Sequence, residues 1–239
     1  MKPSSSRVSS PRYLVAGEKG LVVEFGSAID PETNGRVQRL YRSLGRDQIP
    51  GVGEIVPTFR SLLVSYDPLV IGFDELVSRI QAVRTRPLEE TPAKNVVIIP
   101  TVYGGEFGPD IEFVARQNHI SVEEVIRLHT SVDYLVYMIG FTPGFPYLGG
   151  LPSAIATPRL QVPRTRVAAG SVGIAGEQTG VYAVESPGGW QLIGRTPLRL
   201  YDPTREKNPV LLEPGDSVRF ERIDEGRFRE MEDGLTADY

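Results

Sequence analysis

The chain contains no cysteine and only two histidines, His119 and His129. The absence of cysteine excludes disulfide bonds, thiol nucleophiles and thiolate metal sites, and it is compatible with the cytoplasm. Two histidines are too few for a histidine-rich metal centre, so we expect no metal site.

Several other signals are missing. There is no Gly-Lys dipeptide, which excludes a Walker A loop, and no G-x-G-x-x-G pattern, so no familiar nucleotide cradle is present. No apolar run approaches the roughly 18 residues of a membrane span, and the first eleven residues lack the apolar centre of a signal peptide. A net charge of −4 argues against nucleic-acid binding. We therefore expect a cytoplasmic protein without nucleic-acid or membrane partners.

Glycine and proline are concentrated in residues 140–197. This segment holds 11 of the 25 glycines, 7 of the 20 prolines and the only tryptophan. It is too rich in apolar residues to be disordered, so we expect a folded, turn-rich segment of the kind that carries functional sites. Its four arginines outnumber its two glutamates, which gives a local net charge of +2 in an acidic chain. This combination favours a small anionic ligand or an acidic partner segment.

The first part of the chain shows a ββαββα pattern. Two short apolar runs flank residues 17–20, as in a hairpin. Asp30 and Pro31 fit the start of a helix that ends near Gly45. Two further strands and a second helix complete a small α+β unit.

After residue 132, short strands alternate with frequent turns, which is typical of a β-barrel or sandwich. Two short helices, beginning at residues 108–110 and at Ser121, precede this region. We predict five segments: a disordered tail (1–11), an α+β domain (12–86), a linker rich in proline and acid (87–94), a β-barrel domain (95–226) and a charged, frayed C-terminal tail (227–239).

His129 has two readings that the sequence leaves open. It shares a helix face with Val125 and Ile126, which suits a buried histidine with satisfied hydrogen bonds. It also precedes the strand that leads to Gly140, where an imidazole could serve as a catalytic acid or base. His119 lies in a loop-like context and is expected at the surface.

Arg164 and Arg166 are two residues apart, so an extended backbone would place both on one face. Two guanidiniums there could bind a carboxylate, although a solvated surface strand would look the same. The amides of Gly170, Ser171 and Val172 are candidates to complete an anion site. Ser171 is not expected to be a nucleophile, because no helical pattern follows it.

Four aromatic residues of the same segment are candidates for a pocket wall or a partner surface: Phe141, Phe145, Tyr147 and Trp190. They could equally be ordinary core residues. Gln191, next to the tryptophan, is assigned to the substrate site with the arginines. The apolar stretch 140–152 is the expected partner-binding loop.

Residues 138–152 (MIGFTPGFPYLGGLP) resemble the KipI family, whose members are also known as 5-oxoprolinase B subunits or allophanate hydrolase subunit 1-like proteins. Residues 169–180, 185–197 (ESPGGWQLIGRTP) and 56–64 (VPTFRSLLV) are similar to the same family. The resemblance extends over roughly residues 13–222.

The resemblance implies a small α+β domain followed by a cyclophilin-like β-barrel. It also implies two partners, a KipA-like protein (the C subunit of 5-oxoprolinase) and a LamB/YcsF-type protein (the A subunit). Together they would form an ATP-dependent 5-oxoprolinase that opens 5-oxoproline to L-glutamate, with ATP as co-substrate and no tightly bound cofactor. The alternative is inhibition of a sporulation sensor histidine kinase. We expect the chain to be inactive without its partners.

Overall fold

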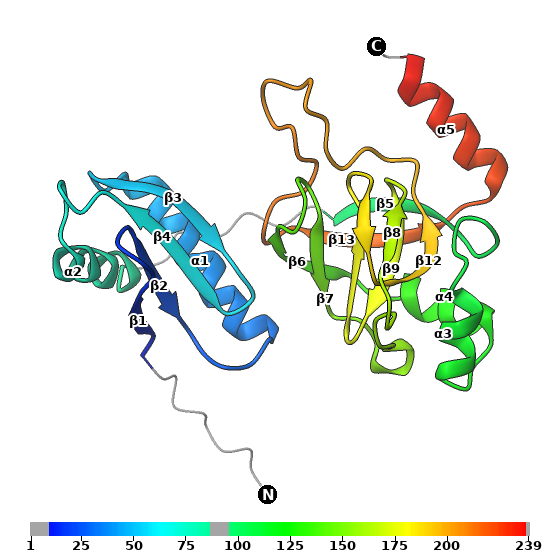
Figure 1. The fold of residues 1–239 in the computed structure, drawn as a ribbon, viewed down its shortest axis with the longest axis horizontal. Helices are drawn as coiled ribbons and strands as arrows, with labels where there is room; N and C mark the ends of the chain where they lie inside the picture. Colours follow the sequence, from blue (N-terminus) through cyan, green and yellow to red (C-terminus); the bar gives the residue numbers. More distant parts are fainter. Residues whose placement is uncertain (1–9, 87–95, 238–239) are drawn as a thin grey trace, which may run out of the picture. The chain divides into compact units, whose positions relative to one another are not determined.

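The computed structural model describes residues 10–86 and 96–237, with side chains up to residue 234 (Figure 1). The chain divides into two compact units, residues 1–92 and 93–239. The expected linker at 87–94 and most of the expected tail at 1–11 lie outside the described residues. None of the helices in the described part is long and apolar enough to cross a membrane.

The first unit has the predicted ββαββα order, with an antiparallel sheet of strand order β1-β2-β4-β3. Helix α1 contacts β3, β4 and α2. Apolar residues from the sheet and both helices, among them Leu21, Leu40, Leu62 and Ile80, form a core of their own. The elements are β1 (Arg12–Val15), β2 (Gly20–Glu24), α1 (Pro31–Asp47), β3 (Val52–Pro57), β4 (Ser61–Tyr66) and α2 (Phe73–Arg84).

Helix α1 begins as its sequence predicts. The Asp30 carboxylate accepts a hydrogen bond from the Thr33 amide at 2.9 Å, and Pro31 occupies the first turn. The helix continues to Asp47, past the glycine at which we expected it to end. Gln48 then adopts a left-handed conformation with φ of 42°. Gly45 is accommodated inside the helix, because tertiary packing can outweigh low helix propensity.

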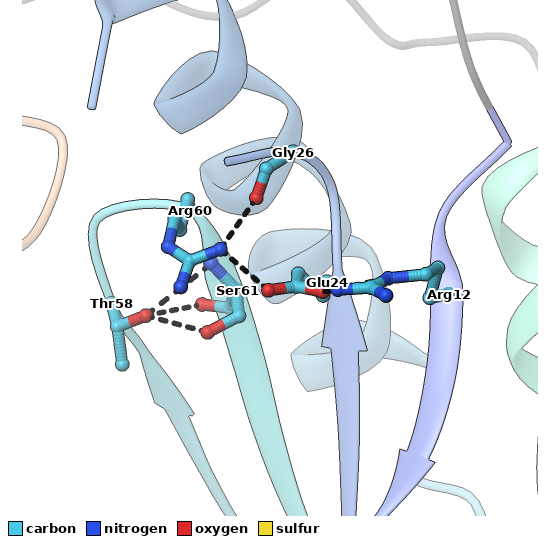
Figure 2. A network of polar contacts seen from close by, with 6 residues as sticks. All are labelled: Arg12, Glu24, Gly26, Thr58, Arg60 and Ser61. Atoms are coloured by element: carbon cyan, nitrogen blue, oxygen red, sulfur yellow. Dashed lines mark hydrogen bonds and ion pairs between the residues drawn. The ribbon is translucent and has the colours of Figure 1, made fainter. Parts of the chain in front are cut away.

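The turn between β3 and β4 is held by the polar network in Figure 2. The Thr58 hydroxyl donates to the Ser61 carbonyl at 3.0 Å. Arg60 donates to the Gly26 carbonyl at 2.8 Å and pairs with Glu24, which also binds Arg12. The hydrogen bond from Arg12, aided by the charge of Arg60, holds the pKa of the Glu24 carboxyl below its usual value. These contacts give residues 58–61 a structural role.

The second unit is built on a closed seven-stranded barrel with strand order β10-β7-β6-β13-β5-β12-β9. Neighbouring strands are antiparallel, except that β13 runs parallel to β5. Strands β8 and β11 form a separate two-stranded sheet. The predicted fold class, α+β with a ββαββα unit followed by a β-barrel unit, is confirmed. The strands are β5 (Val96–Tyr103), β6 (Tyr134–Ile139), β7 (Pro146–Gly149), β8 (Arg164–Val167), β9 (Ser171–Ala175), β10 (Gln178–Val181), β11 (Ser186–Gly188), β12 (Gln191–Arg195) and β13 (Ser217–Arg222).

Helices α3 (Ile111–Gln117) and α4 (Val122–Thr130) pack against each other beside the barrel (Figure 1). Ser121 caps α4 by accepting from the Glu124 amide at 3.1 Å. A 3-10 turn, η1 (Ser153–Ile155), contacts α4.

The expectation of a frayed C-terminal tail at 227–239 is wrong as far as residue 237. Helix α5 (Glu225–Ala237) occupies this region. Phe228 is buried, with its ring 4.9 Å from the Phe107 ring, and Arg195 lies over it. One buried aromatic side chain therefore attaches this charged helix to the barrel unit.

Candidate functional site

The barrel unit contains a cavity of about 420 Å³ with a largely aromatic wall. All four aromatic residues that the sequence singled out line it, and Tyr182 joins them. The cavity volume is within the range of small-molecule sites. The lining consists of Phe141, Thr142, Phe145, Tyr147, Arg159, Leu160, Pro163, Tyr182, Ser186, Pro187, Gly188, Gly189 and Trp190.

Phe145 is the centre of the aromatic cluster. Its ring makes edge contacts with Tyr147, Tyr182 and Trp190 at centroid distances of 5.0, 5.3 and 5.3 Å. Such edge-to-face pairs are favourable beyond the burial of apolar area. The wall of the cavity is therefore set by packing among the protein's own aromatic side chains.

Two glycines make room for these rings. A Cβ atom on Gly188 would lie 2.2 Å from the Tyr182 hydroxyl oxygen, and one on Gly180 would lie 3.1 Å from the Trp190 ring. The glycines at these two positions therefore leave space for the aromatic side chains that form the cavity.

Phe141 is the exposed member of the cluster. Its side chain is 61% exposed, whereas Phe145, Leu148 and Leu151 from the same stretch are buried. Its φ of 66° is unusual for a residue other than glycine and is costly for a bulky side chain. The stretch 140–152 thus exposes little apolar surface, because most of its large side chains lie in the core, and its role as the partner-binding loop stays a prediction.

Arg159 is the one charged residue among those that line the cavity. Its guanidinium carbon lies 5.9 Å from the centre of the Trp190 ring. Burial raises the pKa of Tyr147, and the charge of Arg159 opposes that shift. Within the described residues, no hydrogen bond or ion pair engages its guanidinium.

Arg164 and Arg166 each have a carboxylate partner within the protein. Arg164 pairs with Asp110 at 2.7 Å, and Arg166 pairs with Glu185 at 2.7 Å. Asp110 also accepts from the Leu192 amide at 2.7 Å. Both guanidiniums are therefore engaged by acids of the protein, and neither arginine is among the cavity-lining residues. Their binding of a ligand carboxylate stays a prediction that requires these pairs to open.

The three amides proposed for the anion site are engaged by the main chain. The Gly170 amide donates to the Tyr182 carbonyl at 2.7 Å, and the Ser171 amide donates to the Ala168 carbonyl at 3.3 Å. Val172 lies in β9 between β10 and β12. Their role in anion binding therefore stays a prediction without geometric support.

Gln191 is buried in β12, and its side chain contacts the backbone segment that carries Arg159. Its side-chain amide donates to the Pro158 carbonyl at 2.9 Å. The Leu160 amide donates to the Gly189 carbonyl at 2.7 Å. The backbone on both sides of Arg159 is thus held in place. Gln191 is not among the cavity-lining residues, and its assignment to the substrate site stays a prediction.

His129 lies in the barrel core and does not line the cavity. Its Nδ1 is 2.8 Å from the Tyr103 hydroxyl, and its Nε2 is 2.9 Å from the Thr179 hydroxyl. The Thr179 hydroxyl donates to the Gly173 carbonyl at 3.0 Å, so it must accept from Nε2–H. Nδ1 then accepts from Tyr103. Both ring nitrogens are therefore satisfied in one neutral tautomer.

Burial lowers the pKa of His129 to about 3. Its ring also packs against Phe220 at a centroid distance of 4.4 Å. A general acid or base works best with a pKa near the operating pH. This environment favours the core reading of His129, and the catalytic role stays a prediction. His119 is exposed, as expected.

A second cavity, of about 440 Å³, lies within the first unit and has four arginines in its lining. Arg36 donates to the Phe25 carbonyl, and Arg86 pairs with Asp47. None of the sequence-predicted site residues lines this cavity. The aromatic cavity of the barrel unit is therefore the candidate site.

Four lining residues with polar side chains were not assigned to the site from sequence: Thr142, Arg159, Tyr182 and Ser186. Arg159 was counted only as part of the local positive charge. The available signal was its location between Pro158 and Pro163, where a stiff backbone presents one cation. Only the tertiary contacts show that, within the described part of the chain, Arg159 lacks the acid partners that Arg164 and Arg166 have.

Comparison with known proteins identifies the relatives of the chain. It is 46% identical over 228 residues to the B subunit of 5-oxoprolinase from Bacillus subtilis (strain 168), a match that covers 90% of this chain and 94% of the relative. It is 44% identical over 215 residues to the B subunit of 5-oxoprolinase from Escherichia coli O157:H7, covering 90% and 96% of the two chains.

The crystal structure of the Kluyveromyces lactis urea carboxylase shares the fold. Its TM-score is 0.75 at 24% identity, and the match covers 96% of this chain but only 23% of that longer one. The family model named carboxyltransferase domain, subdomain C and D, matches residues 11–212. This chain therefore belongs to the carboxyltransferase subdomain C and D family.

Proposed function

We propose that this chain is the B-type subunit of a complex that uses ATP to open 5-oxoproline to L-glutamate. The observation that carries the proposal is the 46% identity to a 5-oxoprolinase B subunit across nearly the whole of both chains. In the reaction, the lactam C–N bond breaks as one water adds to the carbonyl carbon. A second water is consumed as ATP is converted to ADP and phosphate.

The complex would contain a KipA-like C-type protein and a LamB/YcsF-type A-type protein, in the cytoplasm. The relatives are named as B subunits, which supports the existence of partner subunits. We assign ATP use to the complex as a whole, because this sequence has no familiar nucleotide-binding loop. No contact among the described residues favours the alternative, a KipI-type inhibitor of a histidine kinase.

The contribution of this chain would be the aromatic cavity. Its volume and its rigid ring cluster suit a small ligand. A catalytic centre with a perturbed histidine or carboxyl group, or a metal cluster, is not found in it among the described residues. We therefore expect the chain to bind and orient, with the bond-breaking groups supplied in the assembled complex.

The test is reconstitution. The three proteins are purified separately and mixed, and phosphate and glutamate release are measured with and without 5-oxoproline. We expect release of both products only when all three are present, and no turnover by this chain alone. Full activity of the partner pair without this chain would contradict the proposal. Turnover by this chain alone would show that its predicted dependence on partners is wrong.

A further inference from the structure

Arg159 is a positive charge that the described part of the protein does not neutralise. It is the single charged side chain on the cavity lining, and no acidic residue is among the lining residues. Trp190 contacts its guanidinium through the ring face and leaves the N–H groups available. Arginine recognises carboxylates through two parallel hydrogen bonds, so this cation is suited to a ligand carboxylate.

The backbone that carries Arg159 is held by hydrogen bonds within the protein. Gln191 holds the Pro158 carbonyl, and Gly189 holds the Leu160 amide. A third contact, the bridge between Thr157 and Gly176, anchors the chain just before Pro158. A cation on such a segment loses little further backbone freedom on binding, which favours affinity.

Two hydroxyl groups at the cavity are separate evidence that it binds a polar ligand. The Thr142 and Ser186 hydroxyl oxygens are buried, and neither has a hydrogen-bond partner among the described residues. Ser186 is 9% exposed and belongs to the lining. Buried hydroxyl groups normally have hydrogen-bond partners. Unpaired hydroxyl groups at a cavity therefore indicate that a ligand or a water molecule binds there.

We propose that Arg159 is the carboxylate-binding residue of this cavity, and that the cavity takes a small ring carboxylate. The aromatic rings contact the ring of the ligand, and the Thr142 and Ser186 hydroxyls hydrogen-bond its polar ring atoms. In 5-oxoproline these atoms are the lactam N–H and carbonyl. The choice of that compound rests on the proposed function, whereas the ligand class rests on the cavity.

Trp190 makes the proposal directly measurable, because it is the only tryptophan in the chain and lines the cavity. Its fluorescence is followed while 5-oxoproline is added to the purified chain, and calorimetry gives an independent dissociation constant. 2-Pyrrolidinone, the same lactam ring without the carboxylate, is the ligand control. Arg116→Gln is the matched protein control, because Arg116 is an exposed arginine with one surface ion pair on α3.

We expect Arg159→Gln to weaken 5-oxoproline binding about tenfold or more, since it removes a charge-assisted contact. Arg159→Lys keeps the positive charge but lacks the planar guanidinium that makes two parallel hydrogen bonds. We therefore expect its affinity to lie between those of wild type and Arg159→Gln. We expect Arg116→Gln to bind 5-oxoproline as wild type does. We also expect the binding of 2-pyrrolidinone to be weak and to be unchanged by Arg159→Gln. Unfolding curves for each variant establish that the folded protein is being compared.

The same variants are placed in the reconstituted complex, where Arg159→Gln should raise KM for 5-oxoproline by a similar factor. If the complex turns over and Arg159→Gln changes neither binding nor KM, the inference is overturned while the proposed function stands. If the complex is inactive but the chain binds a ring carboxylate through Arg159, the proposed 5-oxoprolinase function is contradicted, whereas the proposed carboxylate site is supported. A loss of affinity confined to Arg164→Lys or Arg166→Lys would overturn the inference and move the carboxylate site to β8.

Discussion

At the scale of single residues, burial explains the properties of His129. The side chain is 0% exposed, and its two nitrogens bind the Tyr103 and Thr179 hydroxyls. Burial also raises the pKa of Tyr103, which keeps that hydroxyl protonated and able to donate. A charged imidazole would also donate from Nδ1, so the Tyr103 hydroxyl would have to change from donor to acceptor in this contact.

The depressed pKa makes His129 a source of acid sensitivity. The unfolded chain takes up a proton near pH 6.5, whereas the folded chain does so near pH 3. The contribution of His129 to folding stability is therefore present above pH 6.5 and lost as the pH falls. We expect His129 to account for a loss of about 2 kcal/mol in the free energy of unfolding between pH 7.5 and pH 5.

The measurement is urea unfolding across that pH range for wild type, His129→Gln and His119→Gln. His129→Gln should remove most of the pH dependence above pH 5, where carboxyl groups contribute less. The exposed His119 serves as the control, and its variant should retain the wild-type slope. An unchanged slope in His129→Gln would contradict the neutral, buried state. If the reconstituted complex loses all turnover with a folded His129→Gln variant, the catalytic reading is favoured.

At the scale of elements, β12 connects the barrel to the cavity. Trp190, immediately before β12, forms the wall, and Gln191, its first residue, holds the Pro158 carbonyl. One strand end thus places both the ring under Arg159 and the anchor of the segment that carries it. Displacement of this strand end would therefore move both Trp190 and Arg159 at the cavity.

Gln191→Met keeps the size of the side chain but removes the hydrogen bond to Pro158. We expect it to weaken 5-oxoproline binding about two- to tenfold through misplacement of Arg159. The readout is a double-mutant cycle with Arg159→Gln, because a positioning residue should have no effect once the residue it positions is gone. Equal effects in both backgrounds would indicate a role independent of Arg159.

The loop between β6 and β7 presents one exposed aromatic side chain, Phe141. An exposed phenylalanine with a left-handed backbone is consistent with a residue kept for binding. We expect Phe141→Asp to weaken co-purification with the C-type partner, because a charge would be buried at the contact. Leu69→Asp, at a 94% exposed position in the first unit, is the control. Full co-purification of a folded Phe141→Asp variant would place the interface elsewhere.

At the scale of the whole molecule, each unit has its own hydrophobic core. The first unit buries residues such as Leu21 and Leu76, and the barrel unit buries residues such as Val136 and Ile174. A unit with its own core can fold by itself. The cavity and its single tryptophan belong entirely to the barrel unit.

We therefore expect a fragment of residues 93–239 to fold and to bind 5-oxoproline with an affinity within about threefold of the full chain, a difference below about 1 kcal/mol. Circular dichroism, thermal unfolding and the Trp190 titration check this expectation. A fragment that unfolds cooperatively but has lost ligand binding would show that the first unit contributes to the site. The fragment of residues 1–92 lacks the tryptophan and should not bind the ligand.

Local patterns were sufficient to predict much of the fold. Asp30 and Ser121 cap helices through bonds that span three residues, so their sequence neighbours are enough to identify them. The ββαββα order follows from apolar periodicity. The density of glycine and aromatic residues in 140–197 marked the segment that lines the cavity, because rings packed against backbone require glycine beside them.

Contacts between distant residues decided the site itself. By sequence, Arg159, Arg164 and Arg166 are three cations in one basic segment, and only the spacing of Arg164 and Arg166 distinguishes them. Arg164 is engaged by Asp110, which lies 54 residues away along the chain, whereas Arg159 meets a tryptophan face and no acid among the described residues. The availability of a charge depends on which opposite charge the fold brings near it. His129 likewise has an ordinary helical pattern, and the closed barrel alone removes it from water and lowers its pKa.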